Sequence, residues 1–144
     1  MDYQKLNLLF RCSKEFSHGR IRMQDLSDTE CMICSYIYSH ENCSQDDVSA
    51  ALKIDKTTVG KALASLEKKN CVARTKDIAD KRFKRLSLSE IGHDKISELL
   101  DIHDHWLHSI MTCLSKEEQQ QFENYCDRLL IAAEKMTNTG ENDR

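Results

Sequence analysis

Residues 44–92 restrict the fold of this chain most strongly, because they place two short amphipathic helices around a tight turn. The first helix is expected to follow Ser44, which with Asp47 forms the Ser-x-x-Asp pattern of a helix N-terminus. The second is expected to follow Asp55, a residue that favours the N-cap position. Its apolar residues recur at helical spacing, at Val59, Ala62, Leu63 and Leu66. The pattern predicts a helix-turn-helix.

The opposite side of the second helix lacks bulky apolar residues, as a helix in a DNA major groove requires. That side holds Thr57, Lys61, Ala64 and Lys68. Two alternating segments follow, at residues 72–76 and 83–88, and they predict a hairpin. Because its tip carries Lys81 and Arg82, the hairpin resembles a wing that grips phosphates or enters a minor groove.

Charge along the chain is strongly segregated. The formal net charge is -3, yet residues 53–85 hold eleven Lys and Arg against four Asp and Glu, a net charge of +7. The rest of the chain therefore carries a net charge of -10. A basic face on an acidic body is expected of a protein that binds phosphate groups. Since the basic segment coincides with the helix-turn-helix, we predict double-stranded DNA as the partner.

The flanking segments are also expected to be helical, and the fold class is mainly α with a small β wing. Apolar faces on the terminal helices exceed what the DNA-binding region has room to cover, which favours a symmetric dimer. The predicted division is a dimerisation helix at 1–25, a winged helix-turn-helix at 26–92, dimerisation helices at 93–137 and a flexible tail at 138–144. The first helix is expected to span residues 2 to about 24.

Several functional classes lack their sequence motifs. No apolar run approaches the ~20 residues that span a bilayer, and the N-terminus lacks a signal-peptide pattern, so a cytoplasmic protein is expected. Glycine-rich phosphate loops, G-x-S-x-G and H-E-x-x-H are absent, which argues against an enzyme and against a bound cofactor. A winged-helix protein-interaction module stays open as an alternative, although Lys61 and Lys68 favour phosphate over an apolar partner surface.

Three motifs give the chain a family resemblance. They are the segments Asp55–Val59, Leu66–Asn70, and Asp80–Arg82 leading into Leu86–Gly92. In this order and spacing, they resemble the MarR family of bacterial winged helix-turn-helix regulators, over almost the whole chain. The wing departs from the family pattern, since Ile78 stands where a proline is frequent and Lys81 replaces a common arginine. Phe83 is also bulkier than the family pattern leads us to expect.

The resemblance implies a transcriptional regulator, expected to be a repressor, that binds a pseudo-palindromic operator as a homodimer. The two recognition helices would enter major grooves about 34 Å apart, and the wings would reach the flanking minor grooves. Arg82 is the residue expected to insert there, with Asp80 holding it. The other expected DNA contacts are Lys56, Thr57, Thr58, Gly60, Lys61, Lys76, Lys81, Lys84 and Arg85.

The means of control stays open between a small ligand and thiol oxidation. Cys12 occupies the first helix, where some relatives resembling this chain place a redox cysteine, and Arg11 and Lys14 nearby would favour a thiolate. The alternative for Cys12 is a small buried hydrophobe. Cys31 and Cys34 have C-x-x-C spacing inside an apolar helix, and we interpret them as core residues.

A ligand pocket and a metal site are the remaining possibilities. A small aromatic effector would need apolar walls, and the candidates are Phe10, Phe16, Tyr36, Tyr38 and Trp106. A metal-responsive regulator of zinc type is the alternative, because Asp104 and His108 lie one helical turn apart beside His103, within reach of Glu30 or Cys31. A surface or interface role for these histidines is the simpler interpretation.

Overall fold

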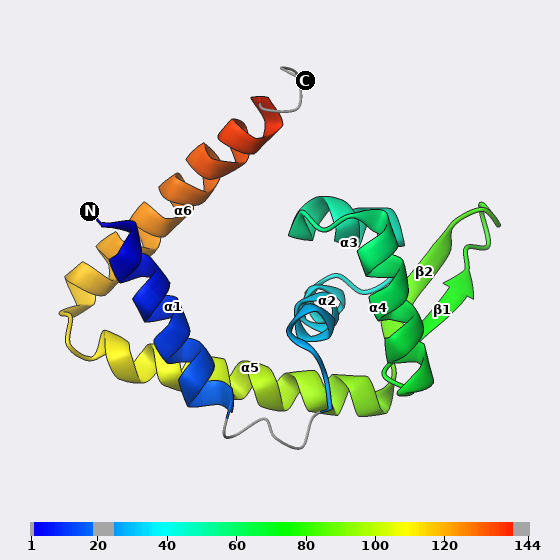
Figure 1. Cartoon of the computed structure of the whole chain (residues 1–144), viewed down its shortest axis with the longest axis horizontal. Coiled ribbons are helices and arrows are strands. Elements are labelled where there is room, and N and C mark those ends of the chain that lie inside the picture. The colour runs from blue at the N-terminus through cyan, green and yellow to red at the C-terminus, as the bar shows by residue number, and fades with distance from the viewer. Residues whose placement is uncertain (1, 19–24, 140–144) are drawn as a thin grey trace. The chain divides into compact units, whose positions relative to one another are not determined.

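The computed structural model describes residues 2–18 and 25–139 (Figure 1). Its elements are α1 (Tyr3–His18), α2 (Asp28–Ser39), α3 (Gln45–Leu52), α4 (Lys56–Lys68), β1 (Val72–Lys76), β2 (Lys84–Leu88), α5 (Glu90–Met111) and α6 (Lys116–Thr139). The prediction of a mainly α fold with a small β wing is confirmed. The predicted end of the first helix, after residue 18, and the last five residues of the predicted tail lie outside the described residues.

The chain divides into two compact units, and the boundary falls between Asp104 and His105, inside α5. In the first unit the core forms where α2, α3, α4 and β2 meet. Its largest fully buried side chains are Ile33, Ile37, Leu63, Leu66, Leu86, Ile96, Val48 and Val59. Burial of each such side chain contributes roughly 1.5 to 3 kcal/mol. One face of α4 is thereby fixed against the core, and the opposite face is left for solvent.

Side-chain caps set the helix starts, as the sequence predicts. Ser44 and Asp47 form a complete capping box, with hydrogen bonds of 3.1 and 2.9 Å between each side chain and the other residue's backbone N–H. Asp55 accepts from the Thr58 backbone N–H at 2.8 Å and so caps α4. Because these caps depend on local sequence alone, they were predictable.

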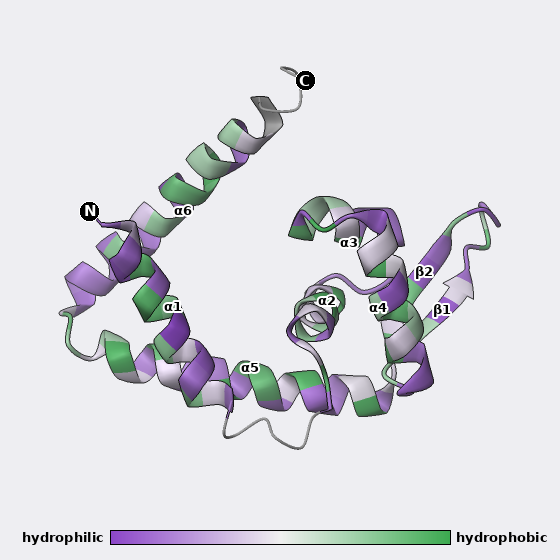
Figure 2. Cartoon of the chain, in the orientation of Figure 1, coloured by the Kyte–Doolittle hydropathy of each residue, from purple (hydrophilic) through white to green (hydrophobic). Residues whose placement is uncertain are grey.

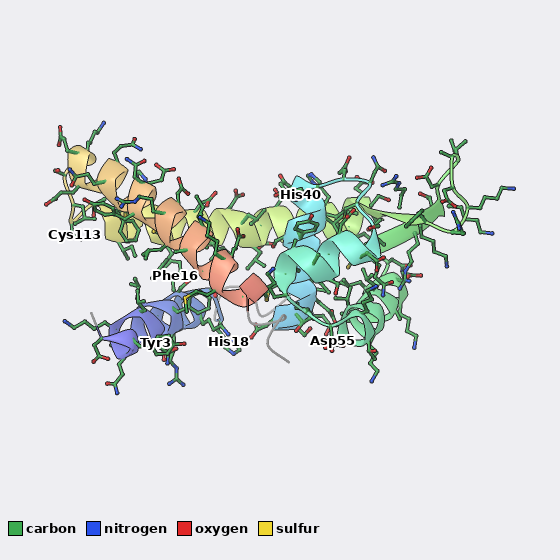
Figure 3. The ribbon with its side chains drawn as sticks, turned by 90° about the horizontal axis from the view of Figure 1, so that it is seen from above. Tyr3, Phe16, His18, His40, Asp55 and Cys113 are labelled. Atoms are coloured by element: carbon green, nitrogen blue, oxygen red, sulfur yellow. The ribbon has the colours of Figure 1, made fainter. Side chains whose placement is uncertain are left out.

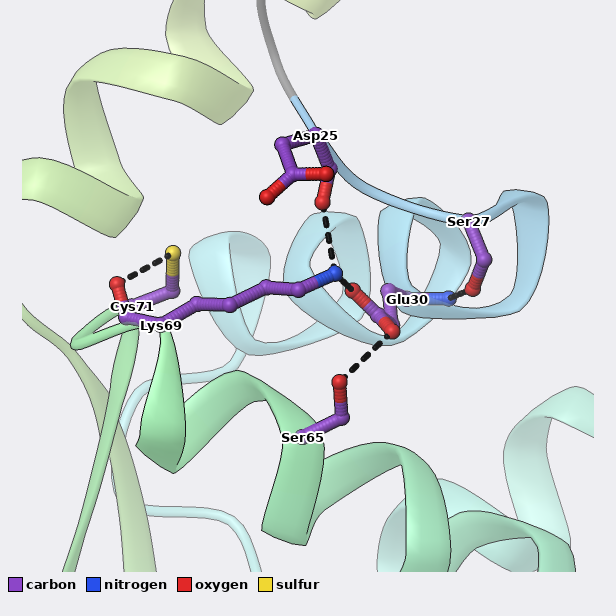
Figure 4. A network of polar contacts seen from close by, with 6 residues as sticks. All are labelled: Asp25, Ser27, Glu30, Ser65, Lys69 and Cys71. Atoms are coloured by element: carbon purple, nitrogen blue, oxygen red, sulfur yellow. Dashed lines mark hydrogen bonds and ion pairs between the residues drawn. The ribbon is translucent and has the colours of Figure 1, made fainter.

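Ser27 and Glu30 have the spacing of a capping box, but the box forms only in part. Ser27 accepts from the Glu30 backbone N–H at 3.2 Å, but the Glu30 carboxylate does not close the box (Figure 4). It accepts instead from the Ser65 hydroxyl at 3.0 Å and from Lys69 Nζ at 2.8 Å. This bond to Glu30 raises the pKa of Lys69, which also donates to the Asp25 carbonyl at 2.6 Å. Glu30, a residue only 7% exposed, therefore ties α2 to the C-terminal end of α4.

Helix α4 ends in a tight turn against the start of α5. Asn70 takes a left-handed φ of 57°, and the Cys71 N–H bonds back to the Leu66 carbonyl at 2.9 Å. Ser89 caps α5 by accepting from the Gly92 N–H at 3.0 Å. A Cβ atom placed on Gly92 would lie 2.1 Å from the Cys71 carbonyl oxygen, so only glycine fits at this crossing.

The two strands form an antiparallel hairpin whose register runs from Val72 opposite Leu88 to Lys76 opposite Lys84. An isolated bridge between Cys43 and Leu86 joins the loop before α3 to the hairpin. Leu86 is fully buried, and this anchors the base of the wing in the core. In Figure 2, hydrophilic residues predominate on the wing strands and their connecting loop.

The second unit presents apolar surface along α6. None of the described side chains of α6 is buried, and Figure 2 shows hydrophobic and hydrophilic residues alternating along it. Its exposed large apolar residues are Phe122, Tyr125, Leu129, Leu130, Ile131 and Met136. Helix α1 of the first unit likewise exposes Leu6, Leu8, Leu9 and Phe10. None of the helices that the structure describes is both long enough and apolar enough to cross a membrane.

Candidate nucleic-acid interface

The outward face of α4 carries the polar residues that the sequence predicts. Thr57 and Lys61 are exposed, whereas Val59 and Leu63 are fully buried on the other side. Lys56 is exposed and lies 3.3 Å from an Asp46 carboxylate oxygen at the start of α3. An exposed pair of this kind is weak, so a phosphate can compete for the lysine.

Thr58 has a different place from its neighbour Thr57. Its hydroxyl donates to the Asp55 carboxylate at 2.6 Å, and its backbone N–H donates to the same carboxylate. These two bonds lower the pKa of Asp55, so the cap is ionised at neutral pH. In this conformation Thr58 stabilises the start of α4, and Thr57 is the freer of the two threonines for contact with DNA.

Gly60 lies in the interior of α4, where its nearest neighbour is a flexible side chain. A Cβ atom at this position would lie 3.2 Å from Gln45 Nε2, and nothing else is within contact distance. A small shift of the Gln45 side chain would make room for a methyl group. The protein's own packing therefore does not require glycine here.

The variant Gly60→Ala is expected to raise the free energy of unfolding by up to about 1 kcal/mol, because alanine favours the helical state over glycine. Urea denaturation would measure this change, and operator affinity measured on the same sample tests whether close approach of the backbone to DNA requires glycine here. Greater stability with weaker DNA binding would show that the backbone at residue 60 approaches DNA. A fall in stability would mean that Gln45 does not move aside.

The wing tip holds Arg82 in a fixed direction. Arg82 donates from Nε and from a terminal nitrogen to the two carboxylate oxygens of Asp80, at 3.1 and 3.0 Å. The Arg82 backbone N–H also donates to Asp80, at 3.1 Å. These bonds lower the pKa of Asp80 and raise the pKa of Arg82, so both groups are charged at neutral pH. The Arg82 side chain nevertheless remains 88% exposed, which leaves it accessible to a ligand.

Arg85 has a supporting position that the sequence does not reveal. Its Nε donates to Asp77 at 2.8 Å, and a terminal nitrogen donates to the Asn42 carbonyl at 3.0 Å. Asp77 also accepts from the Ala79 N–H at 2.9 Å, and these bonds lower the pKa of Asp77, the Ala79 N–H contributing most. Arg85 thus braces the wing against the loop before α3, rather than extending toward solvent as expected of a phosphate contact.

A second brace joins the wing to the helix-turn-helix. Arg74 of β1 pairs with Glu67 of α4 and donates to the Gln45 side-chain oxygen at 3.3 Å. Gln45 in turn donates to the Lys56 carbonyl at 3.3 Å. A pocket lies next to this brace, lined by Ser44, Gln45, Asp46, Arg74, Arg82, Phe83, Lys84 and Leu86. Wing cations and the beginning of α3 therefore share one surface.

The wing lysines concentrate positive charge on the hairpin. Lys76 and Lys84 stand directly opposite each other in the strand register, and both are exposed, as is Lys81 at the tip. Like charges at opposite positions of a hairpin are destabilising. A polyanion bound along the wing would relieve this repulsion, which is a physical reason to place phosphates there.

The cysteines differ in exposure, from exposed through half-buried to buried. Cys12 of α1 is exposed, as is Cys113 after the end of α5 (Figure 3). Burial raises the pKa of Cys31 to about 11 and that of Cys34 to about 12, so both remain protonated at neutral pH. Both also belong to or pack against the core, which confirms the interpretation of the C-x-x-C pair as core residues. Cys12 is accessible, contrary to the alternative of a buried hydrophobe.

The structure does not bring the candidate metal ligands together. Across residues 2–18 and 25–139, no group of three or more His, Cys, Asp or Glu side chains is placed to hold a metal ion, and this includes His103, Asp104 and His108. The candidate pocket aromatics have separate partners. Tyr36 stacks on His40 at 4.2 Å between ring centroids, and Tyr38 lies 4.9 Å from His93.

Comparisons with known proteins indicate the family that this chain resembles. The sequence profile of the MarR family matches residues 24–82. The transcriptional repressor MprA of Escherichia coli (strain K12) is 29% identical over 122 residues, which cover 83% of this chain and 69% of the relative. Both comparisons support a MarR-family winged-helix regulator. The predicted family is thus confirmed.

Solved structures of MarR-type proteins share the fold. The S. aureus MepR–DNA complex is similar with a TM-score of 0.77 and 24% identity, over 92% of this chain and 98% of that chain. The crystal structure of MarR is similar with a TM-score of 0.78 and 22% identity, over 96% of this chain and 97% of that chain. Since the curated MarR-family relatives are named as transcriptional regulators, the prediction of a regulator rather than an enzyme is also confirmed.

Proposed function

We propose that this MarR-family protein binds a pseudo-palindromic operator in double-stranded DNA as a homodimer and represses transcription in the cytoplasm. The observation that carries the proposal is the surface shared by α4 and the wing. It joins the exposed Thr57 and Lys61 of α4 to a hairpin whose Arg82 is held outward by Asp80. A fixed guanidinium suits entry into a minor groove, and the surrounding lysines suit phosphate contacts.

The individual residues take different roles under this proposal. Arg82 enters the minor groove and Asp80 positions it. Thr57 and the backbone at Gly60 approach the major groove. Arg85 and Thr58 act by supporting the wing and the start of α4, since their donors are already engaged. The phosphate contacts are assigned to Lys56, Lys61, Lys76, Lys81 and Lys84.

A homodimer is proposed because the helices outside the DNA-binding region expose apolar side chains. Leu6, Leu9 and Phe10 of α1 are exposed, as are Tyr125 and Leu129 of α6. A symmetric pair covers such faces with one repeated contact. In this arrangement residues 1–25 and 93–137 dimerise and residues 26–92 bind DNA. Helix α6 itself continues to Thr139, two residues into the segment 138–144 that the sequence predicts as a tail.

Named properties of the relatives agree with the proposal. MprA is described as a transcriptional repressor, and MepR has been solved both with DNA and with ethidium bromide. These statements concern those proteins, but a shared family makes DNA binding and control by a small aromatic ligand the natural proposals for this chain. Selection of bound duplexes from random sequence tests the first proposal. An enriched inverted repeat is expected, and a selection without enrichment would contradict it.

Thiol oxidation is proposed as a second means of control, acting at Cys12. Because its sulfur is exposed, mild peroxide is expected to oxidise it to the sulfenic acid while Cys34, Cys43 and Cys71 stay reduced. Mass spectrometry locates the oxidised residue, and operator binding measured in parallel reports the consequence. We expect Cys12→Ser to bind DNA after peroxide treatment. Cys113→Ser is the matched variant at the other exposed cysteine, and its DNA binding should still be lost after peroxide treatment. Oxidation of Cys12 without loss of binding would end the thiol-switch proposal.

A further inference from the structure

The loop at the apex of the wing presents an isoleucine directly to solvent. Ile78 is 101% exposed, so its side chain gains no burial when the protein folds. The surrounding loop is closed by a hydrogen bond from the Asp77 N–H to the Phe83 carbonyl at 2.9 Å. The Asp77 carboxylate also accepts from the Ala79 N–H, which encloses Ile78 in a small turn. The backbone that carries Ile78 is therefore held in a defined shape.

Folding alone does not account for an isoleucine at this position. A single exposed apolar side chain is common on protein surfaces, but Ile78 lies at the tip of a hairpin whose loop is held by hydrogen bonds. The loop depends on the carboxylates of Asp77 and Asp80 and on backbone groups, none of which needs a branched apolar neighbour. The side chain is available for burial against a partner.

The charges around the apex indicate the chemistry of that partner. Lys81, Arg82 and Lys84 follow it, and all three are exposed. The two loop carboxylates are engaged, Asp77 by Arg85 and Asp80 by Arg82. The tip thus carries an exposed apolar side chain followed by three exposed cations, and it complements a surface with anions on both rims and apolar groups between them. A DNA minor groove has this arrangement, since sugars and base edges lie between two rows of phosphates.

We propose that Ile78 enters the minor groove with the wing tip and makes apolar contact with the sugars and base edges there. The inference rests on the proposed function and adds a residue that contributes affinity without charge. Arg82 and the lysines supply the salt-dependent part of binding, and Ile78 supplies a part that salt does not screen. A proline, frequent at this position in the family, would offer the groove a smaller and more rigid apolar surface.

The salt dependence of binding separates an apolar contact from an ionic one. Ile78→Ser is expected to weaken operator binding about tenfold at every salt concentration, because loss of an apolar contact changes no counterion release. Ile78→Leu, which keeps the apolar area, is expected to bind within about twofold of the wild type. Lys81→Ala is the matched ionic control from the same loop, and it should lower the slope of log K against log salt by about 0.9.

Modified DNA tests where the contact lies. Replacement of adenine by 2,6-diaminopurine in the flanking segments adds an amino group to the minor groove while the major-groove edge is kept. Wild-type binding is expected to weaken on this DNA, and Ile78→Ser binding should weaken less, because only the contact of Arg82 with the groove is left in the variant. The inference is overturned if Ile78→Ser binds like the wild type, or if its loss is the same on both DNAs. It is also overturned if the wild type binds anionic vesicles more tightly than operator, whereas failure of the wild type to bind any duplex would refute the proposed function itself.

Discussion

Arg82→Ala is expected to weaken operator binding at least tenfold while the thermal unfolding of the protein stays unchanged. The guanidinium is held by two bonds to Asp80 but is 88% exposed, so its loss removes a DNA contact without disturbing the core. An exposed ion pair contributes little to stability. Fluorescence anisotropy with labelled operator at fixed moderate salt measures the affinity, and calorimetry of the free protein checks the fold.

Two variants at the same turn distinguish the position of Arg82 from its charge. Arg82→Lys keeps the positive charge but loses the two-point contact with Asp80, and an intermediate loss of affinity is expected. Asp80→Asn keeps the guanidinium but weakens the hydrogen bonds that hold it. The operator affinity of this variant should also lie between those of the wild type and Arg82→Ala. If Arg82→Ala binds operator as tightly as the wild type at moderate salt, Arg82 does not belong to the DNA-binding site.

Gly92→Ala is expected to lower the free energy of unfolding by about 3 kcal/mol, because a methyl group would overlap a backbone atom. The Cβ atom would lie 2.1 Å from the Cys71 carbonyl oxygen, and neither helix α5 nor the turn before β1 can relieve this by rotating a side chain. The resulting fall in Tm is roughly 6 to 12 °C. Urea denaturation and calorimetry both measure the change.

Gly60→Ala is the matched control, since it makes the same substitution in another helix. Only the flexible end of Gln45 lies near the added methyl group, so stability should move in the opposite direction. Equal stability of Gly92→Ala and the wild type would show that α5 can shift away from the Cys71 backbone. The close crossing would then not be what selects glycine at residue 92.

Local patterns in the sequence were enough to predict most element boundaries. The start of α3 and α4 follows from Ser44 and Asp55, whose side chains bond to backbone groups three residues later. The strand at residues 72–76 was predicted with the bounds that β1 has, and the second strand begins one residue later than predicted. These features depend on neighbours in sequence, so periodicity and capping rules suffice for them.

Side chains that bond over long sequence distances were not predictable in the same way. Glu30 could close a capping box, but its carboxylate bonds instead to Ser65 and Lys69, which lie 35 and 39 residues later in the chain. Arg85 reads as one more basic residue of the wing, yet the Asn42 carbonyl, 43 residues earlier, accepts one of its donors. Part of the Asp77 site could have been predicted, because an aspartate at the start of a turn commonly accepts a hydrogen bond from a backbone N–H two residues later.

The same limit applies to the surface of the wing. The sequence shows that Lys76 and Lys84 both belong to a basic hairpin, but only the register places them opposite each other. The sequence likewise shows that Ile78 stands where a proline is frequent in the family. Only the structure shows that the Ile78 side chain is fully exposed. Charge and order of elements thus predict the class of partner, and the structure separates the exposed basic side chains from those that are engaged within the protein.

The affinity of the wild-type protein for the DNA upstream of its own gene is the direct measure of sequence-specific DNA binding. It should be compared, near 150 mM salt, with the affinity for a scrambled duplex of equal length and composition. Specific regulators typically prefer their sites by about a thousandfold or more, so a preference of that order is expected. Equal affinity for the two duplexes, or no binding to either, would contradict the account of α4 and the wing as a DNA-reading surface.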